Sequence, residues 1–188
     1  MKRVILFIVG RSGSGKDLLA EMLKGRGVSK VVSYTTRPLR KGEKLGQNHW
    51  HVPLEGFEKP KDTFAYTIYG EHHYYTTDCQ ILSAPEIKSY IVDEDGVLYA
   101  KERQKLEKYK NVIPVYIKVD VSEETLKNRG ISSERIARDK GRVGNIPNDK
   151  YDYVISNNGT PHELIKQGEH ILKDVCKKHN INLQNYKI

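Results

Sequence analysis

Short apolar runs alternate along this chain with segments that repeat apolar residues at a helical spacing. Residues 4–9 form a continuous apolar run rich in β-branched side chains, which is typical of a strand buried on both faces of a parallel sheet. Residues 17–24 carry apolar side chains at the helical period, and this pattern stops at Gly25. The same reasoning predicts further strands at residues 31–34, 89–92, 113–119 and 151–156. It predicts further helices at residues 97–108, 123–129, 133–140 and about 161–179.

Two of these helices begin with strong capping signals. Ser122 precedes Glu123 and Glu124, so a hydroxyl can cap the helix while two acids favour the positive end of its dipole. Thr160 is followed by a proline and, three residues on, by Glu163, which together form a capping box with proline at the first helical position. Both helix starts are therefore fixed by local chemistry.

Aromatic residues gather between residues 49 and 77, where they alternate with polar residues and turn near Gly70. This pattern predicts antiparallel strands in a small inserted lobe. The preceding segment, residues 37–46, is basic and contains proline and glycine, which predicts a loop. Elsewhere strands alternate with helices, so we expect one α/β domain with a mostly parallel sheet and two insertions.

Composition agrees with a single polar-surfaced globule. The chain has 188 residues, of which 37% are hydrophobic and 30% charged. It holds no apolar run of the roughly 18–20 residues that a membrane span needs, so we expect no membrane association. The first residues resemble a secretory signal, but the apolar run is short and leads into a glycine-rich turn. We therefore expect a buried first strand in a cytoplasmic protein, with Cys79 and Cys176 as free thiols.

The net charge of +8 raises the possibility of a nucleic-acid partner. The positive residues are dispersed, however, and a cleft that holds two polyanionic substrates is basic for its own reasons. We do not expect nucleic acid to be the main partner. Two groups of histidines, residues 49–51 and His72-His73, invite a metal site, but adjacent residues on a strand face opposite ways. We expect these histidines to be polar positions of a cleft.

Residues 10–16 fit the pattern G-x-x-x-x-G-K between the first strand and the first helix. Glycines let the backbone turn so that its N–H groups converge on phosphate oxygens, and the helix N-terminus adds partial positive charge. Lys16 is expected to reach the β- and γ-phosphates. The expected nucleotide-binding residues are Gly10, Arg11, Ser12, Gly13, Ser14, Gly15, Lys16 and Asp17.

Asp17 stands where the P-loop pattern has Ser or Thr, whose hydroxyl binds Mg²⁺. An aspartate also binds hard cations through oxygen, so Asp17 is a candidate magnesium ligand. Certain phage deoxynucleotide kinases and animal phosphomevalonate kinases resemble this chain in having Lys-Asp at this place. The substitution is therefore not a sign of lost activity.

A second motif narrows the class of protein. Residues 32–40 read Val-Ser-Tyr-Thr-Thr-Arg-Pro-Leu-Arg and are followed by Gly42-Glu43 and Gly46. This segment resembles the S-Y-T-T-R-x-x-R-x-G-E-x-x-G motif of the guanylate kinase family. Arg37 and Arg40 can form a two-guanidinium clamp for an acceptor phosphate, because the arginine fork matches phosphate geometry.

The resemblance implies a P-loop NTPase three-layer fold with a mostly parallel central sheet, a small β-rich insertion that binds the nucleoside monophosphate, and a short lid. It covers nearly the whole chain. The implied boundaries are a core at residues 1–36, 85–128 and 150–188, an acceptor lobe at about residues 37–84, and a lid at about residues 129–149.

Further segments resemble the family in the same order. Tyr74-Tyr75 is similar to the N-Y-Y-G-[ST] motif, which implies Tyr75 on the acceptor phosphate and Thr77 near the base. Residues 91–95 are similar to [IL]-L-D-x-D, which implies Asp93 near the metal and Asp95 near the acceptor base.

Toward the C-terminus, Arg129-Gly130 resembles the start of the lid that closes on ATP phosphates, with Arg138 or Arg142 beyond it. Residues 151–157 are similar to Y-D-Y-x-I-x-N, which implies Asn157 near adenine.

The chain also departs from the family. The acceptor-lobe glutamate that reads guanine falls at Tyr66, or at Phe64 if the turn is longer by two residues, and neither side chain accepts two hydrogen bonds as a carboxylate does. A phosphate-contacting tyrosine is replaced by His49, which can still donate from its imidazole. Ser33, Thr77 and Asp95 remain candidates for reading the base, and the lid is short.

We therefore expect an ATP-dependent nucleoside monophosphate kinase, with GMP or dGMP as acceptor and Mg²⁺ bridging the phosphates. Transfer would be in line, with Lys16, Arg37 and the lid arginines acting by position and charge. The alternatives are a kinase for another (deoxy)nucleotide or phosphorylated sugar, and a silent guanylate-kinase-like binding module. An intact P-loop lysine and arginine pair argue against the silent module. We expect a monomer or weak homodimer.

Overall fold

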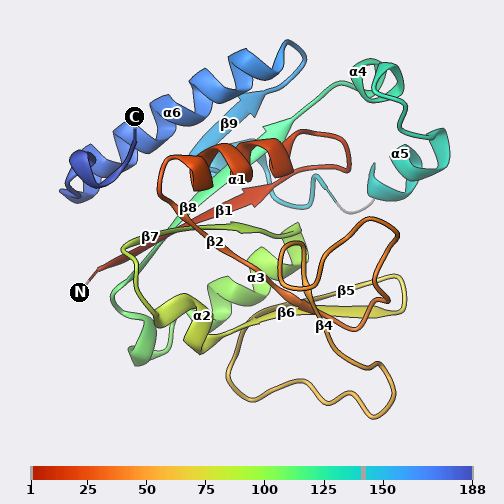
Figure 1. Cartoon of the computed structure of the whole chain (residues 1–188), viewed down its shortest axis with the longest axis horizontal. Coiled ribbons are helices and arrows are strands. Elements are labelled where there is room, and N and C mark those ends of the chain that lie inside the picture. The colour runs from red at the N-terminus through yellow and green to blue at the C-terminus, as the bar shows by residue number, and fades with distance from the viewer. Residues whose placement is uncertain (1, 141–142, 188) are drawn as a thin grey trace.

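The centre of the molecule is a parallel sheet whose middle strand is the first one predicted. The computed structural model describes residues 2–140 and 143–187. Within these residues the strands lie in the order β2-β7-β1-β8-β9, all parallel (Figure 1). Their bounds are β1 (Arg3–Val9), β2 (Ser29–Val31), β7 (Ile87–Ile91), β8 (Val112–Asp120) and β9 (Tyr153–Ser156). The predicted α/β fold with a mostly parallel sheet is confirmed.

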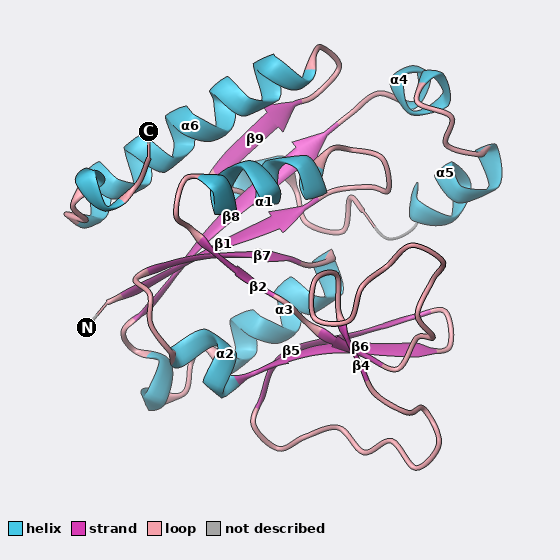
Figure 2. Cartoon of the chain, in the orientation of Figure 1, coloured by secondary structure: helices cyan, strands magenta, loops and turns pink. Residues whose placement is uncertain are grey.

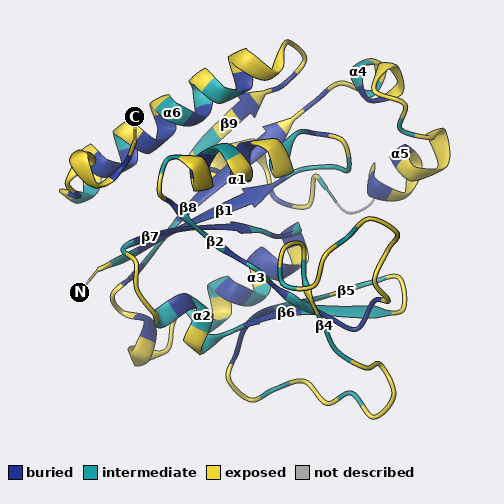
Figure 3. Ribbon diagram, viewed as in Figure 1, coloured by how far each residue is buried: buried dark blue, intermediate teal, exposed yellow. Residues whose placement is uncertain are grey.

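The alternation of side chains along β1 supplies two hydrophobic cores, one on each face of the sheet. Val4, Leu6 and Ile8 pack on one side with residues of α1 (Lys16–Gly25) and α6 (Pro161–His179). The two helices approach closely at Gly168, where an added Cβ would lie 2.3 Å from the Met22 side chain. Figure 3 shows this sheet as the buried centre beneath helices whose outer faces are exposed.

On the other face, Ile5, Phe7 and Val9 pack against α3 (Glu94–Arg103) and against a second sheet. This sheet has the order β4-β3-β6-β5 in the described part of the chain. Its strands are β3 (Tyr34–Thr35), β4 (Trp50–His51), β5 (Thr63–Tyr69) and β6 (His72–Thr77), and β6 leads into α2 (Asp78–Leu82). The Phe7 and Phe64 rings stack with centroids 6.3 Å apart, which joins the two sheets into one core.

Two short helices, α4 (Glu123–Asn128) and α5 (Ser133–Lys140), project beyond the carboxyl end of β8 (Figure 2). Single 3₁₀ turns lie at Glu107–Tyr109, Asn148–Lys150 and Leu183–Asn185. Among the described residues, the helices are too short or too polar to cross a membrane.

Helices whose caps are visible in the sequence have the predicted starts. Ser122 accepts a hydrogen bond from the Thr125 amide, and Thr160 and Glu163 form the expected capping box. The helix expected at residues 97–108 instead begins at Glu94, because the Asp93 carboxylate caps the Gly96 amide at 2.9 Å. It also ends earlier, at Arg103.

Two strand predictions are corrected. The strand expected at residues 31–34 is divided, because the chain leaves the parallel sheet after Val31 and enters the second sheet at Tyr34. The second sheet therefore begins before residue 37, the expected start of the lobe. The lobe strands were expected to be antiparallel; β5 and β6 are, but β4 pairs with β3 in parallel.

Candidate active site

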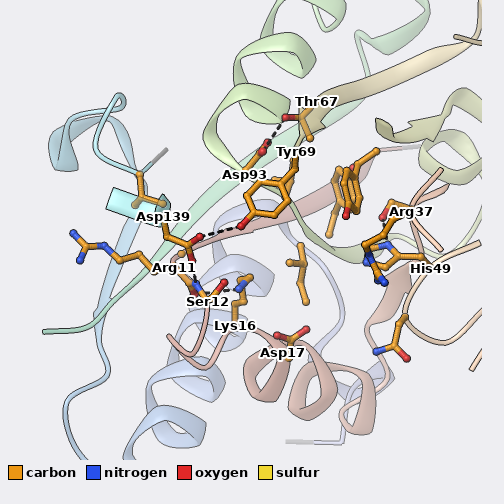
Figure 4. A pocket seen from close by; sticks show the side chains of 18 of the residues that line it. Arg11, Ser12, Lys16, Asp17, Arg37, His49, Thr67, Tyr69, Asp93 and Asp139 are labelled. Carbon is orange, nitrogen blue, oxygen red and sulfur yellow. Dashed lines mark hydrogen bonds between the residues drawn. The ribbon is translucent and has the colours of Figure 1, made fainter. Parts of the chain in front are cut away.

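A cavity of about 420 Å³ opens at the carboxyl ends of β1 and β7, where α/β folds place their ligands. The P-loop forms its floor, the second sheet one wall, and α5 the opposite wall (Figure 4). Its lining includes Gly10, Arg11, Ser12, Lys16, Asp17, Lys30, Ser33, Arg37, Arg40, Glu43, His49, Thr67, Tyr69, Tyr74, Asp93, Arg135, Arg138 and Asp139. The cavity thus brings together the P-loop and the predicted arginine clamp.

The P-loop has the backbone conformation that its glycines predict. Gly13 and Gly15 have positive φ angles of 76° and 97°, which side chains rarely tolerate, and α1 begins directly after them at Lys16. The Lys16 ammonium points back over the loop and donates to the Arg11 carbonyl at 3.1 Å. Burial lowers the pKa of Lys16, against the carboxylates of Asp17 and Asp139, which raise it.

Two residues predicted to contact ATP brace the loop from outside the cavity lining. The Asn157 amide is buried and donates to the Ser14 carbonyl at 2.7 Å. The Arg129 guanidinium donates to the carbonyls of Gly13 and Asn157 at 3.0 and 2.8 Å. Their observed contacts fix the P-loop backbone, because the loop has carbonyl groups that no sheet or helix satisfies.

At the acceptor end, Arg37 is buried and forms an ion pair with Glu43. One guanidinium nitrogen of Arg37 donates to both carboxylate oxygens of Glu43, at 2.9 and 3.0 Å. Glu43 also accepts a hydrogen bond from the backbone N–H of Arg40 at 3.0 Å. One carboxylate therefore contacts both residues of the predicted arginine clamp. Burial opposes the charge of Glu43, but the hydrogen bonds from Arg40 and Arg37 lower its pKa. Glu43 belongs to the sequence motif, which gave it no role.

His49 lies beside this pair and is held by the hydroxyl of Ser33, 2.8 Å from its Nδ1 atom. Burial and the neighbouring Arg37 charge lower the pKa of His49 to about 4. The imidazole is therefore neutral at physiological pH. It can offer an N–H to a phosphate oxygen without adding a fixed positive charge.

The hairpin of β5 and β6 turns a different face to the cavity from the one expected. Side chains alternate along a strand, so a shift of one residue exchanges the two faces. Thr67, Tyr69 and Tyr74 line the cavity, with Thr67 directly opposite Tyr74 in the strand pairing.

The expected acceptor residues Tyr66 and Tyr75 lie opposite each other on the other face, outside the cavity lining. The buried Tyr75 ring stacks on Tyr34 at 5.1 Å, and the Tyr66 hydroxyl lies 2.6 Å from His73 Nδ1. Thr77, also outside the lining, is the N-cap of α2. The hairpin thus lies where the resemblance implied, with Thr67, Tyr69 and Tyr74 on its cavity face and Tyr66 and Tyr75 on the opposite face.

The lid contributes a different set of arginines from the set expected. Arg138 lines the cavity, Arg129 braces the P-loop, and Arg142 lies outside the described residues. Arg135, which sequence reasoning missed, lines the cavity one helical turn before Arg138. The i, i+3 spacing of these two arginines on α5 was a signal that could have revealed the pair.

Two carboxylates face the cavity where a metal ion could meet the phosphates. Asp17 is exposed at the start of α1, and Asp93 accepts the Thr67 hydroxyl at 2.8 Å. Asp95 lies on the exposed side of the first turn of α3 and outside the cavity lining. Among the described residues, no three His, Cys, Asp or Glu side chains gather as a metal site. Asp17 and Asp93 suit Mg²⁺, which in nucleotide sites takes one or two carboxylates and completes its shell with phosphate and water.

Comparisons with known proteins identify the family. The guanylate kinase family model matches residues 1–175. A guanylate kinase of Chromobacterium violaceum is 28% identical over 167 residues, covering 81% of this chain and 77% of the relative. A guanylate kinase of Legionella pneumophila is 29% identical over 167 residues, covering 81% and 78%.

A crystal structure of guanylate kinase from Anaplasma phagocytophilum shares the fold, with a TM-score of 0.59, 21% identity, and coverage of 92% of this chain and 86% of that one. An unliganded sugar kinase from Janibacter superposes less well, with a TM-score of 0.52 and 13% identity over 92% of this chain and 95% of that one. A family model matches most of the chain, and the P-loop shares one cavity with Arg37 and Arg40. The chain therefore belongs to the guanylate kinase family of nucleoside monophosphate kinases.

Proposed function

We propose that this protein transfers the γ-phosphoryl group of ATP to GMP or dGMP to give the nucleoside diphosphate. The observation that carries the proposal is one cavity with a P-loop lysine at one end and the Arg37–Arg40 pair at the other. Donor and acceptor phosphates bound at these two ends would meet between them. The names of the relatives support guanine as the acceptor base.

The protein's part in the reaction is to hold the phosphates and neutralise their charge. Lys16 would follow the charge that develops on the transferred group, while Arg37 and Arg40 hold the acceptor phosphate. Arg135 and Arg138 would approach from the lid side. No side chain needs to act as a nucleophile, because the acceptor phosphate itself attacks the γ-phosphorus and ADP leaves.

We also propose which parts of the fold bind the acceptor and which close over the donor. Residues from about 37 to 84 form the acceptor lobe, and residues from about 129 to 149 form the lid. Closure of both around the substrates would exclude water, which otherwise competes as the acceptor. The interaction of α5 with the P-loop and with β5 supports this arrangement.

Mg²⁺ fits this site, and Asp17 and Asp93 are the residues that would hold it. When bound, the ion neutralises the donor phosphates and orients them for in-line displacement. The Thr67 hydroxyl already fixes the Asp93 carboxylate at the cavity wall. We propose that Asp17 replaces the P-loop hydroxyl as a ligand, directly or through water.

The test is a coupled ADP-release assay with purified protein, ATP, Mg²⁺ and each ribo- and deoxyribonucleoside monophosphate in turn. We expect the fastest turnover with GMP or dGMP. Turnover with none of them contradicts the proposal, and turnover with a different monophosphate contradicts the choice of base.

Lys16→Ala provides the control for the assay. It should lower kcat by about 1000-fold or more, because the lysine contacts the charge that develops in transfer. Its circular dichroism spectrum should match that of the wild type. A fully active Lys16→Ala protein would show that the turnover comes from a contaminant or from another site.

A further inference from the structure

Asp139 stands apart from the other polar residues of the lid helix. α5 exposes most of its charged side chains, yet Asp139 is only 7% exposed and shares the buried face with Ile136. Carboxylates are rarely buried unless hydrogen bonds or charges compensate them. The reaction proposed above gives this carboxylate no role.

The two oxygens of Asp139 are used by two different parts of the molecule. Oδ2 accepts the backbone N–H of Ser12 in the P-loop at 2.9 Å. Oδ1 accepts the hydroxyl of Tyr69, at the end of β5, at 3.2 Å. Figure 4 shows the carboxylate between these two partners. Burial alone would raise the pKa of Asp139, but these hydrogen bonds and the adjacent Arg138 lower it, so the group is ionised at neutral pH.

A second contact joins the same two elements. The Arg138 guanidinium lies over the Tyr69 ring, 5.1 Å from its centroid. Tyr69 therefore meets α5 twice, through its ring and through its hydroxyl. Both contacts therefore depend on the position of the hairpin of β5 and β6 relative to α5.

Asp139 contacts the P-loop at the backbone N–H of Ser12. Ser12 belongs to the P-loop itself, three residues before Gly15, the N-cap of α1, and it lines the cavity. The Asp139 carboxylate also raises the pKa of Lys16, the residue that would meet the γ-phosphate. The KM for ATP of an Asp139 variant therefore distinguishes a contact that persists with nucleotide bound from one that ATP displaces.

We propose that Asp139 is a positioning residue that ties the lid helix to both the P-loop and the acceptor hairpin. Through this tie, Arg135 and Arg138 are held facing the cavity, and the lid reaches its working position only when the acceptor hairpin is in place. The inference rests on the proposed function for its kinetic consequences. Its structural consequence, a lid ordered by one carboxylate, does not depend on the substrate.

The variants are Asp139→Asn, which removes the charge and one acceptor oxygen, and Tyr69→Phe, which removes the hydroxyl and keeps the ring under Arg138. Glu134→Gln is the matched control, because it makes the same kind of change on the exposed side of α5. Each is measured for kcat, for KM of ATP and of GMP, and for ATP hydrolysis without acceptor. Thermal unfolding verifies that each variant folds.

We expect Asp139→Asn to lower kcat by about 10- to 100-fold, the scale of a lost charge-assisted hydrogen bond. KM for ATP should stay within threefold, and the ratio of hydrolysis to transfer should rise because a loose lid admits water. Tyr69→Phe should lower kcat by about three- to tenfold and add little in the Asp139→Asn background. Glu134→Gln should match the wild type.

Two outcomes overturn the inference. One is an Asp139→Asn protein whose kcat and hydrolysis ratio stay within twofold of the wild type. The other is a tenfold lower KM for ATP with kcat unchanged, which would make Asp139 a stand-in for phosphate that ATP displaces. If Asp139→Asn does not fold, Tyr69→Phe decides alone, and a wild-type kcat and hydrolysis ratio in that variant overturn the tie.

Amide hydrogen exchange separates this inference from the proposed function. In the protein without substrates, Asp139→Asn should speed exchange at Ser12 and along α5, while Glu134→Gln should not. This result can be obtained even if no monophosphate is turned over. Unchanged exchange at Ser12 would overturn the tie whatever the substrate.

Discussion

Glu94 offers the sharpest test of how this structure is held together. It is the first residue of α3, its side chain is completely buried, and its carboxylate bonds the C-terminal part of the lid region, at residues 144–146. The backbone amides of Gly144, Asn145 and Ile146 donate to it at 2.7–3.0 Å. The Tyr151 hydroxyl donates to Oε1 of Glu94 at 2.8 Å, an oxygen that the Gly144 amide also reaches. Burial, together with Glu94, raises the pKa of Tyr151.

Replacing Glu94 by Gln keeps the shape and removes the charge. One amide oxygen can still serve the three backbone N–H groups, and the amide nitrogen can donate to Tyr151 if that hydroxyl reverses. Each bond to a charged acceptor is worth about 1.5–3 kcal/mol, against about 0.5–1.5 kcal/mol for a neutral one. Part of this loss is offset because a buried charge no longer has to be desolvated. We expect a net destabilisation of about 1–3 kcal/mol.

Glu94→Ala leaves all four donors without their acceptor and opens a void, so we expect about 4 kcal/mol or more. Glu102→Gln is the control, because Glu102 lies exposed on the same helix in a salt bridge with Lys105 and should cost no more than about 0.5 kcal/mol. Urea unfolding followed by circular dichroism gives the three free energies, and hydrogen exchange should rise at the amides of residues 144–146. A Glu94→Ala protein within about 1 kcal/mol of the wild type would refute the reasoning.

Three further predictions concern the acceptor end. Arg40→Ala should raise KM for the acceptor by about 10- to 100-fold while KM for ATP changes less than threefold; steady-state kinetics decide, and a larger effect on ATP would contradict the clamp. Of the two neighbouring tyrosines, only Tyr74 lines the cavity, so Tyr74→Phe should raise the acceptor KM by about tenfold and Tyr75→Phe by less than twofold. A larger effect of Tyr75→Phe would show that Tyr75 contacts the acceptor, as the family motif implies. The pKa of His49, followed by NMR, should be near 4 and not near 6.5. Between pH 6.5 and 4 the unfolded chain therefore binds a proton at His49 that the folded protein does not, so the free energy of unfolding should fall as the pH drops through this range. The variant His49→Gln should show a smaller fall.

The parts of the fold that were predictable are those decided by nearby residues. The buried run of β1, the P-loop at its end and the capped start of α6 each depend on fewer than about ten consecutive residues. Propensity and capping act at that range. The start of α3 was missed for the opposite reason: Asp93 is both a helix cap and a cavity residue, and its motif suggested only the second role.

At the hairpin, the face that lines the cavity differs from the expected face for another reason. A tyrosine pair on a strand always presents one ring to each face, so the sequence Tyr74-Tyr75 fits the family motif in either register. The packing of Tyr75 on Tyr34 and of Phe64 against Phe7 decides which face is inward. Such contacts join residues more than thirty positions apart, and no local pattern records them.

The lid shows where sequence reasoning stops. The family resemblance implied Arg129, with Arg138 or Arg142, as the lid arginines, but Arg129 bonds the P-loop backbone and Arg138 lines the cavity, which only the fold reveals. Two parts of the lid region are held by buried carboxylates: Asp139 of α5 accepts a hydrogen bond from the P-loop, and Glu94 of α3 accepts hydrogen bonds from residues 144–146. A buried carboxylate is costly unless hydrogen bonds compensate it, and each of these two carboxylates accepts hydrogen bonds at both of its oxygens. On the proposal made above, the direction of Arg135 and Arg138 depends on Asp139, whereas Glu94 fixes the backbone of residues 144–146.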